Sequence, residues 1–115
     1  MRRHHLVFQA ITSRDRHLVV RQVQDALTLA RGWVDDAHFY SNKMTTIRFT
    51  LAAGDLPVFR TTLQEYGVMI EDVTRPGIGA GVASLPDDAE ISGSLQITFL
   101  HNEPDLKQVI PAVPG

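Results

Sequence analysis

The residues best suited to bind a small molecule form one short segment, Ser13, Arg14, Asp15, Arg16 and His17. It combines a hydroxyl, a carboxylate, two guanidinium groups and an imidazole, and a helical pattern follows it directly. The N–H groups of a helix's first turn and the positive end of its dipole attract anions. The segment is therefore the candidate ligand-binding site for a small molecule that carries a carboxylate. Ser13 and Asp15 are also ordinary N-cap residues, so a purely capping role stays open.

Histidines elsewhere in the chain define weaker candidate sites. His4 and His5 are adjacent, so in a strand they point to opposite faces and cannot share a metal ion from one side. His38 and Tyr40 lie on one face of a predicted strand, with Arg48 across the hairpin, and form either a polar site or ordinary cross-strand packing. No spacing matches a zinc signature such as H-E-x-x-H, so no metal site is predicted.

The chain lacks the motifs of the common enzyme classes. No serine lies in a nucleophile-elbow motif, and the acid pairs at 35–36, 71–72 and 87–88 are expected to diverge or to be solvated. The glycine-containing run at 77–81 lacks both G-x-G-x-x-G and the P-loop lysine, and is predicted to be a plain loop. We therefore predict no catalytic residues and no cofactor, and do not expect an enzyme. A small enzyme that uses His17 or His38 remains an alternative.

Apolar periodicity predicts the elements that position these residues. Along 5–11 one face, with Leu6, Phe8 and Ala10, is apolar and the other is half polar, a period of two that indicates a strand. Apolar residues recur at spacings of three and four between Val19 and Ala30, which indicates a helix. Asp55 is expected to cap a second helix, and Gly67 to end it. The complete order is a strand at about 4–12, a helix at 15–31, strands at 34–41 and 44–52, a helix at 55–66, and strands at 68–73 and 94–101.

This order of elements fits an α+β fold of the ferredoxin-like βαββαβ type, with an extra C-terminal strand. Right-handed crossovers place both helices on one face of an antiparallel sheet. The opposite face, which carries Val7 and Ile11, would then meet solvent, the C-terminal tail or another subunit. Whether the last strand pairs within the chain or with a neighbouring subunit stays open. One domain is predicted over 1–115, with a core at about 4–74, a long loop at 75–93, and a last strand and tail at 94–115.

Composition excludes several classes of protein. The chain has 115 residues, of which 43% are hydrophobic and 21% charged, and a formal net charge of −2. It has no cysteine, which excludes disulfide scaffolds, thiol catalysis and cysteine-ligated metal centres. No apolar run is long enough to span a membrane, and the N-terminus lacks a signal-peptide core. We therefore predict a cytoplasmic protein with no membrane partner.

Charge is divided unevenly between the two halves of the chain. Residues 1–60 carry nine Lys/Arg and five Asp/Glu, a net charge of +4, whereas residues 61–115 carry two and eight, a net charge of −6. The basic residues are spread singly and no RNA-binding aromatic signature is present, so no nucleic-acid partner is predicted. Halves of opposite charge are expected to interleave within the chain or to associate between copies.

The segment from Ala10 to Val23 resembles the first strand, loop and helix start of the ACT domain family. The resemblance depends on Asp15-Arg16 at the loop–helix junction, on the apolar residues that follow, and on the order of elements through about Val73. ACT domains are small regulatory modules that often sense amino acids and commonly assemble as dimers, with ligands near the subunit interfaces. The resemblance implies that Asp15 is a partner for a ligand amine and that Arg16 is its neighbour.

Two functions from different classes fit the sequence. The predicted function is that of an ACT-like regulatory module, a homodimer or higher homo-oligomer that binds an amino acid or similar small carboxylate near the first strand–helix loop. The alternative is a ligand-free oligomerisation or interaction subunit that docks on a partner protein, such as a larger enzyme. The donor-rich loop favours ligand binding. Family members usually carry glycines where this chain has Ser13 and Leu18, and the leucine side chain favours the alternative.

Overall fold

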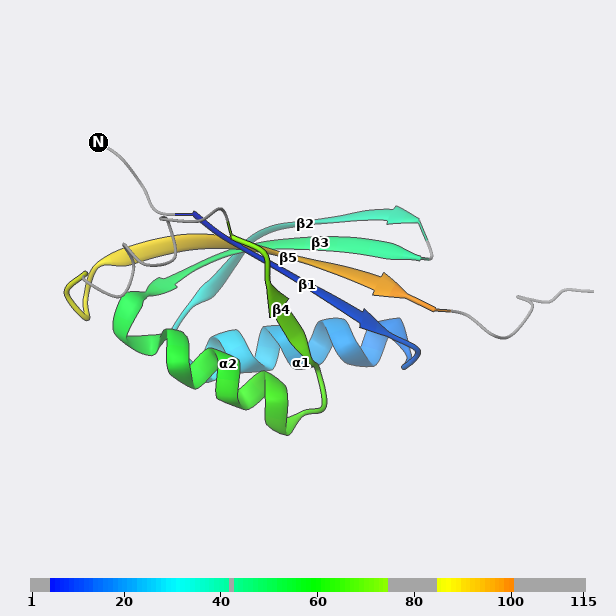
Figure 1. Ribbon diagram of the computed structural model, residues 1–115, viewed down its shortest axis with the longest axis horizontal. Coiled ribbons are helices and arrows are strands. Elements are labelled where there is room, and N and C mark those ends of the chain that lie inside the picture. The colour runs from blue at the N-terminus through cyan, green and yellow to red at the C-terminus, as the bar shows by residue number, and fades with distance from the viewer. Residues whose placement is uncertain (1–4, 42, 75–84, 101–115) are drawn as a thin grey trace, which may run out of the picture.

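The computed structural model describes residues 5–41, 43–74 and 85–100, and arranges them as one five-stranded sheet and two helices. Both helices lie on the same side of the sheet (Figure 1). The predicted α+β class is confirmed, and the helices share one face as expected. The elements are β1 (His5–Thr12), α1 (Arg16–Leu29), β2 (Trp33–Ser41), β3 (Met44–Ala52), the 3-10 turn η1 (Ala53–Asp55), α2 (Leu56–Glu65), β4 (Ile70–Asp72) and β5 (Glu90–Phe99).

The last strand occupies the centre of the sheet. The strand order is β2-β3-β5-β1-β4, so β5 separates β3 from β1. β5 pairs in parallel with β1 along the whole of β1, and antiparallel with β3 along the whole of β3. The remaining pairs, β2 with β3 and β1 with β4, are antiparallel. In this structure β5 therefore pairs within its own chain.

The predicted all-antiparallel sheet is wrong, because this sheet is mixed, and its strand order differs from that of a simple βαββαβ plait. The physical reason lies in the pairing of β5, which lies between β1 and β3 and forms hydrogen bonds with both of them. Its alternating pattern, in which every second residue is buried, suits an edge of the sheet as well as the centre. An edge position would leave one side of β5 without a partner strand.

The core forms between the sheet and the helices. Alternate residues of β1, β3 and β5 face the helices and are buried, which is the period of two that the sequence predicts. α1 adds a buried stripe at spacings of three and four, as expected. The largest fully buried side chains are Phe8, Phe49, Phe59, Phe99, Leu6, Leu27, Ile47, Leu51, Leu63, Ile91, Leu95 and Ile97.

Three aromatic rings meet within this core. Phe49 of β3 stacks against Phe8 of β1 with ring centroids 6.5 Å apart, and contacts Phe59 of α2 with centroids 5.1 Å apart. The Phe49 ring lies directly over Gly93 of β5, since a Cβ atom at this glycine would be 2.5 Å from Phe49 Cζ. Because Gly93 has no side chain, the rings of Phe8 and Phe49, which come from the strands on either side of β5, can contact each other above it.

Two strand boundaries differ from the prediction. The fourth strand is limited to β4, because Val68 packs into the core after the turn at Gly67 instead of extending the strand. β5 begins at Glu90 and not at Ser94, since its first residues also pair with β3, and the predicted loop at 75–93 is shorter accordingly. The predictions for the run at 77–81 and the tail at 101–115 lie outside the described residues.

The helix ends confirm two predicted signals and correct a third. Asp15 is the N-cap of α1, and its Oδ2 accepts a hydrogen bond from the Leu18 N–H at 2.9 Å. Gly67 follows α2 with a φ of 84°, a conformation that favours glycine. Asp55 makes no side-chain capping bond, because η1 already supplies helical backbone before α2. Its carboxylate instead accepts a hydrogen bond from Arg31 Nη2 at 3.0 Å.

The face of the sheet away from the helices is polar. Val7 and Ile11 point to this face as expected, and Ile11 is exposed. Hydroxyl and amide side chains on the neighbouring strands suit a face in contact with water. One row across the five strands reads His38, Thr46, Gln96, Gln9 and Glu71.

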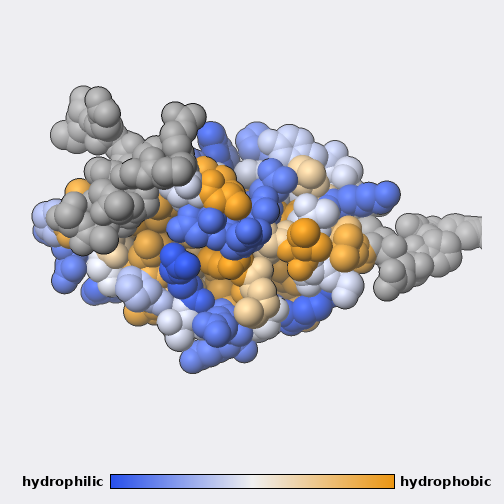
Figure 2. All heavy atoms as spheres, in the orientation of Figure 1, coloured by the Kyte–Doolittle hydropathy of each residue, from blue (hydrophilic) through white to orange (hydrophobic). Residues whose placement is uncertain are grey.

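On the side of the molecule seen in Figure 1, hydrophobic residues lie between hydrophilic ones, as Figure 2 shows. Within the described ranges, neither helix is long and apolar enough to cross a bilayer.

Candidate functional site

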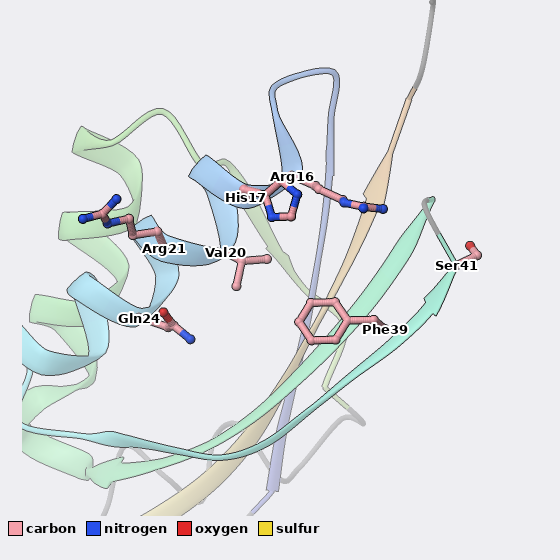
Figure 3. A pocket seen from close by; sticks show the side chains of 7 residues that line it. All are labelled: Arg16, His17, Val20, Arg21, Gln24, Phe39 and Ser41. Atoms are coloured by element: carbon pink, nitrogen blue, oxygen red, sulfur yellow. The ribbon is translucent and has the colours of Figure 1, made fainter. Parts of the chain in front are cut away.

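The first turns of α1 and the second half of β2 enclose a groove of about 610 Å³. Residues four apart on α1 share a helix face, so the helix presents two neighbouring rows of side chains to this groove. The strand presents an aromatic ring and a hydroxyl. The lining consists of Arg16, His17, Val20, Arg21 and Gln24 from α1, and Phe39 and Ser41 from β2 (Figure 3).

The groove lies where α1 covers β2 only in part. β2 is an edge strand, and β3 and β5 separate it from β1. The last four residues of β2 are exposed. Phe39 is 63% exposed although Thr45, its partner on β3, is only 1% exposed.

The groove has a cationic end and an apolar wall. Phe39 points its ring from β2 toward Val20, and Arg16 and His17 lie at the N-terminal end of α1, whereas the Arg21 guanidinium is turned away from Phe39 (Figure 3). None of the seven lining residues is acidic. The arrangement can hold an anion whose apolar part contacts the ring.

The structure brings two of the five predicted site residues, Arg16 and His17, into the groove. Ser13 is exposed and does not line it, and Asp15 is used as the N-cap. Because Asp15 takes the Leu18 N–H and adds a negative charge at the helix start, the backbone of the first turn attracts a ligand anion less than predicted. Side chains must therefore supply most of the attraction.

Arg14 connects the loop to α2 instead of facing the groove. Its Nη1 donates to the carbonyl oxygen of Tyr66 at 2.7 Å, and its backbone N–H donates to Thr12 Oγ1 at 3.1 Å. Tyr66 is the C-cap of α2, so the guanidinium satisfies a carbonyl that the helix leaves unpaired.

Arg14→Ala is expected to lower the free energy of unfolding by about 1–2 kcal/mol, because it removes a charged, part-buried hydrogen bond. Urea denaturation measures this loss. Arg21→Ala removes the same charge at an exposed position and should stay within about 0.5 kcal/mol of the unaltered protein. Equal stability of the two variants would contradict the structural role of Arg14.

Sequence reasoning missed five of the lining residues. The three on α1 follow Arg16 and His17 at intervals of four residues, a helical spacing that indicates a shared face. Phe39 and Ser41 have no such signal, because they approach α1 only through the fold.

Comparison with known proteins identifies no relative. No family model, no curated protein and no solved structure matches the chain. The resemblance to ACT domains thus stays a prediction from the sequence. The groove is the feature from which a function can be inferred.

The second predicted cluster lies on the opposite face of the sheet and is an ion-pair network. Arg48 donates from Nε and Nη2 to the two carboxylate oxygens of Asp36, at 3.0 and 2.8 Å. These hydrogen bonds hold the pKa of Asp36 below its ordinary value. His38 Nε2 lies 3.8 Å from Asp36 Oδ1, and the His38 ring stacks on Tyr40 with centroids 6.1 Å apart. The groups satisfy one another, which favours cross-strand packing over a binding site.

The described residues contain no group of three His, Asp or Glu side chains that could hold a metal ion. His5 approaches two serine hydroxyls through its ring nitrogens, Ser92 Oγ at 3.0 Å and Ser94 Oγ at 3.3 Å. These contacts cross from β1 to β5 and are typical of polar packing on an open sheet face. His4 lies outside the described residues.

Proposed function

We propose that the protein is a regulatory module that binds a small carboxylate in the groove between α1 and β2. The observation that carries the proposal is the convergence of Arg16 and His17 with the exposed ring of Phe39 in one groove. A guanidinium group binds a carboxylate through charge-assisted hydrogen bonds, and an imidazole N–H can donate a further hydrogen bond. The exposed ring is apolar surface that a ligand can cover.

Ligand binding at this groove couples a helix to an edge strand. A molecule that contacts both α1 and β2 stabilises the conformation in which the two are packed, by an amount set by its concentration and affinity. It also shifts any equilibrium in which β2 moves relative to α1. Regulation of an attached or associated protein would use this shift.

The proposed module assembles into a homodimer or higher homo-oligomer through β2. This strand is nine residues long and lies at the edge of the sheet, and no strand of the described residues pairs with its outer side. Pairing of two copies along β2 would pair the backbone groups of that side and extend the sheet.

We propose that the fold is a modified ferredoxin-like plait related to that of ACT domains. Support comes from the arrangement of the first four strands, in which β1 pairs antiparallel with β4, and β2 pairs antiparallel with β3. In a simple plait β1 and β3 would be neighbours, and here β5 lies between them. We treat β5 as a strand added at the centre of such a plait.

A ligand-free interaction subunit is the alternative, and the hydrogen bonds of the loop favour it. Arg14 and Asp15 are both used in structural bonds, and Leu18 is exposed where an ACT domain usually has glycine. In that role the β2 edge would contact a partner protein. The two functions differ in whether a small molecule alone stabilises the protein.

A thermal-shift screen against amino acids and simple carboxylates separates the two functions. A ligand at 100 times its Kd adds about 2.7 kcal/mol to the stability of the folded state, which raises the Tm by an amount on the order of 10 °C. We expect at least one carboxylate to give such a shift. Arg16→Gln combined with His17→Ala should abolish it, whereas Arg31→Gln, which removes an exposed positive charge outside the groove, should retain it.

Two further readouts accompany the screen. Asp15→Ala removes the N-cap of α1 and should lower the free energy of unfolding of the ligand-free protein by about 1 kcal/mol, and its Tm with it. The shift in Tm that the ligand causes should be kept in this variant. If no carboxylate changes the Tm, ligand binding is contradicted and the interaction role remains. A strictly monomeric chain at micromolar concentration, measured by native mass spectrometry, would contradict the proposed assembly.

A further inference from the structure

We infer that the ligand of the groove is an aromatic carboxylate that has no ammonium group. This inference rests on the proposed function and narrows it. The resemblance to ACT domains implies an amino acid, whereas the charges in this groove favour a plain anion. The charge of the lining, its exposed ring and its dimensions carry the inference.

The lining offers nothing that would neutralise an ammonium group. Two of its seven residues are arginines, and none is acidic. Asp15, to which the resemblance assigns the ligand amine, accepts from the Leu18 N–H and does not line the groove. Like charges repel more strongly in a partly desolvated groove than in water. An amino acid would therefore place its ammonium group near Arg16, with no carboxylate of the lining beside it, and lose part of the attraction that its carboxylate gains.

Phe39 supplies an uncovered aromatic surface. It is 63% exposed, and its ring points across the groove toward Val20 (Figure 3). Val20 is half-buried and packs against the core, so it forms a fixed apolar wall. A planar ring placed between the two would be covered on both sides, and aromatic pairs attract beyond their burial of area. A short ligand without a ring, such as propionate, would leave most of the Phe39 surface in water.

The dimensions of the groove suit one ring joined to an anion by a short linker. Its volume of about 610 Å³ lies in the range of small-molecule sites. Arg16 and His17 lie at the N-terminal end of α1, and Phe39 lies opposite Val20, so the anion and the ring would occupy different parts of the groove (Figure 3). An amphipathic anion matches this separation of charge and apolar surface.

Four probes that differ by one group each test the inference by isothermal titration calorimetry on the full chain. The reference probe is 3-phenylpropionate. Phenylalanine adds the α-ammonium group, 3-phenylpropanol replaces the carboxylate by a neutral alcohol, and propionate lacks the ring. We expect 3-phenylpropionate to bind at least about tenfold more tightly than each of the other three probes.

Substitutions on β2 test the position of the ring. Phe39→Ala is expected to weaken binding of 3-phenylpropionate about tenfold, and Phe39→Leu by less, because leucine keeps apolar bulk. Tyr40→Ala is the matched control and should leave the affinity unchanged. Tyr40 is the next residue on the strand, is 64% exposed, and stacks on His38 outside the groove. Since all three substitutions are at exposed positions, the variants should fold, which circular dichroism verifies.

The outcomes separate this inference from the proposed function. Phenylalanine or propionate binding as tightly as 3-phenylpropionate overturns the inference, while carboxylate binding stands. If no probe binds but the thermal screen finds another carboxylate ligand, the inference fails and the proposed function stands. If neither the calorimetry nor the thermal screen finds a ligand, the inference and the ligand-binding function both fail.

Two other occupants of the groove would also overturn the inference. Conversion of a dimer to a monomer by Phe39→Ala would assign the groove to a second copy of the chain. Faster tryptic cleavage after Lys107 in the same variant would assign the groove to the chain's own tail.

Discussion

Phe49→Ala is expected to lower the free energy of unfolding by about 3–5 kcal/mol, a loss typical of deleting a fully buried phenylalanine. Phe49 is 0% exposed and contacts the rings of Phe8 on β1 and Phe59 on α2. Its removal leaves a cavity between the sheet and the helix, which the close-packed neighbours can fill only in part. Urea denaturation followed by circular dichroism should show a lower midpoint with an unchanged m value.

Tyr40→Ala is the control for this loss, because it removes a ring of similar size from an exposed position on the neighbouring strand. We expect it to change stability by no more than about 0.5 kcal/mol. Equal losses for Phe49→Ala and Tyr40→Ala would contradict the aromatic contacts at the centre of the core.

Gly93→Ala is expected to destabilise the protein by about 1–3 kcal/mol, as overpacking of a core does. The usual trend is the reverse, since alanine within a strand is more stable than glycine by about 0.5–1 kcal/mol. Here the added methyl group would lie 2.5 Å from Phe49 Cζ and 2.8 Å from Cε1. The ring cannot withdraw freely, because it packs against Phe59 and Phe8.

Combining Gly93→Ala with Phe49→Leu tests this cause. Leucine lacks the ring that the added methyl group would contact. Gly93→Ala should therefore lower the free energy of unfolding by less in the Phe49→Leu variant than in the unaltered protein. The expected coupling is on the order of 1 kcal/mol in a double-mutant cycle. A Gly93→Ala variant as stable as the unaltered protein would contradict the close approach of the ring to β5.

The place of β5 connects the packing of the core to the proposed site. Gly93 lets the rings of Phe8 and Phe49 meet above β5, which allows this strand to lie between β1 and β3. β2 lies at the edge of this sheet, where α1 covers it only in part. Phe39 is consequently exposed beside the N-terminal turns of α1, where Arg16 and His17 lie.

Much of the local structure could be predicted. The alternation along 44–52 predicts β3 with the bounds that the structure has, and the stripe from Val19 to Ala30 predicts the buried face of α1. The sequence predicts Ser13 or Asp15 as the N-cap of the first helix, of which the structure uses Asp15, and it predicts Gly67 as the end of the second helix. Of the candidate site, Arg16 and His17 were found, since both follow directly from their place at the start of a helix.

The sequence by itself determined these features because they are local. Helical and strand periods, caps and turns depend on residues only a few positions apart. Tertiary structure alone decided the central position of β5, the bond from Arg14 to α2, and the groove that brings Phe39 to α1. These depend on which strands pair across the whole chain. An alternating pattern with one buried face suits any position in a sheet, so it could not distinguish the centre, where β5 lies, from an edge.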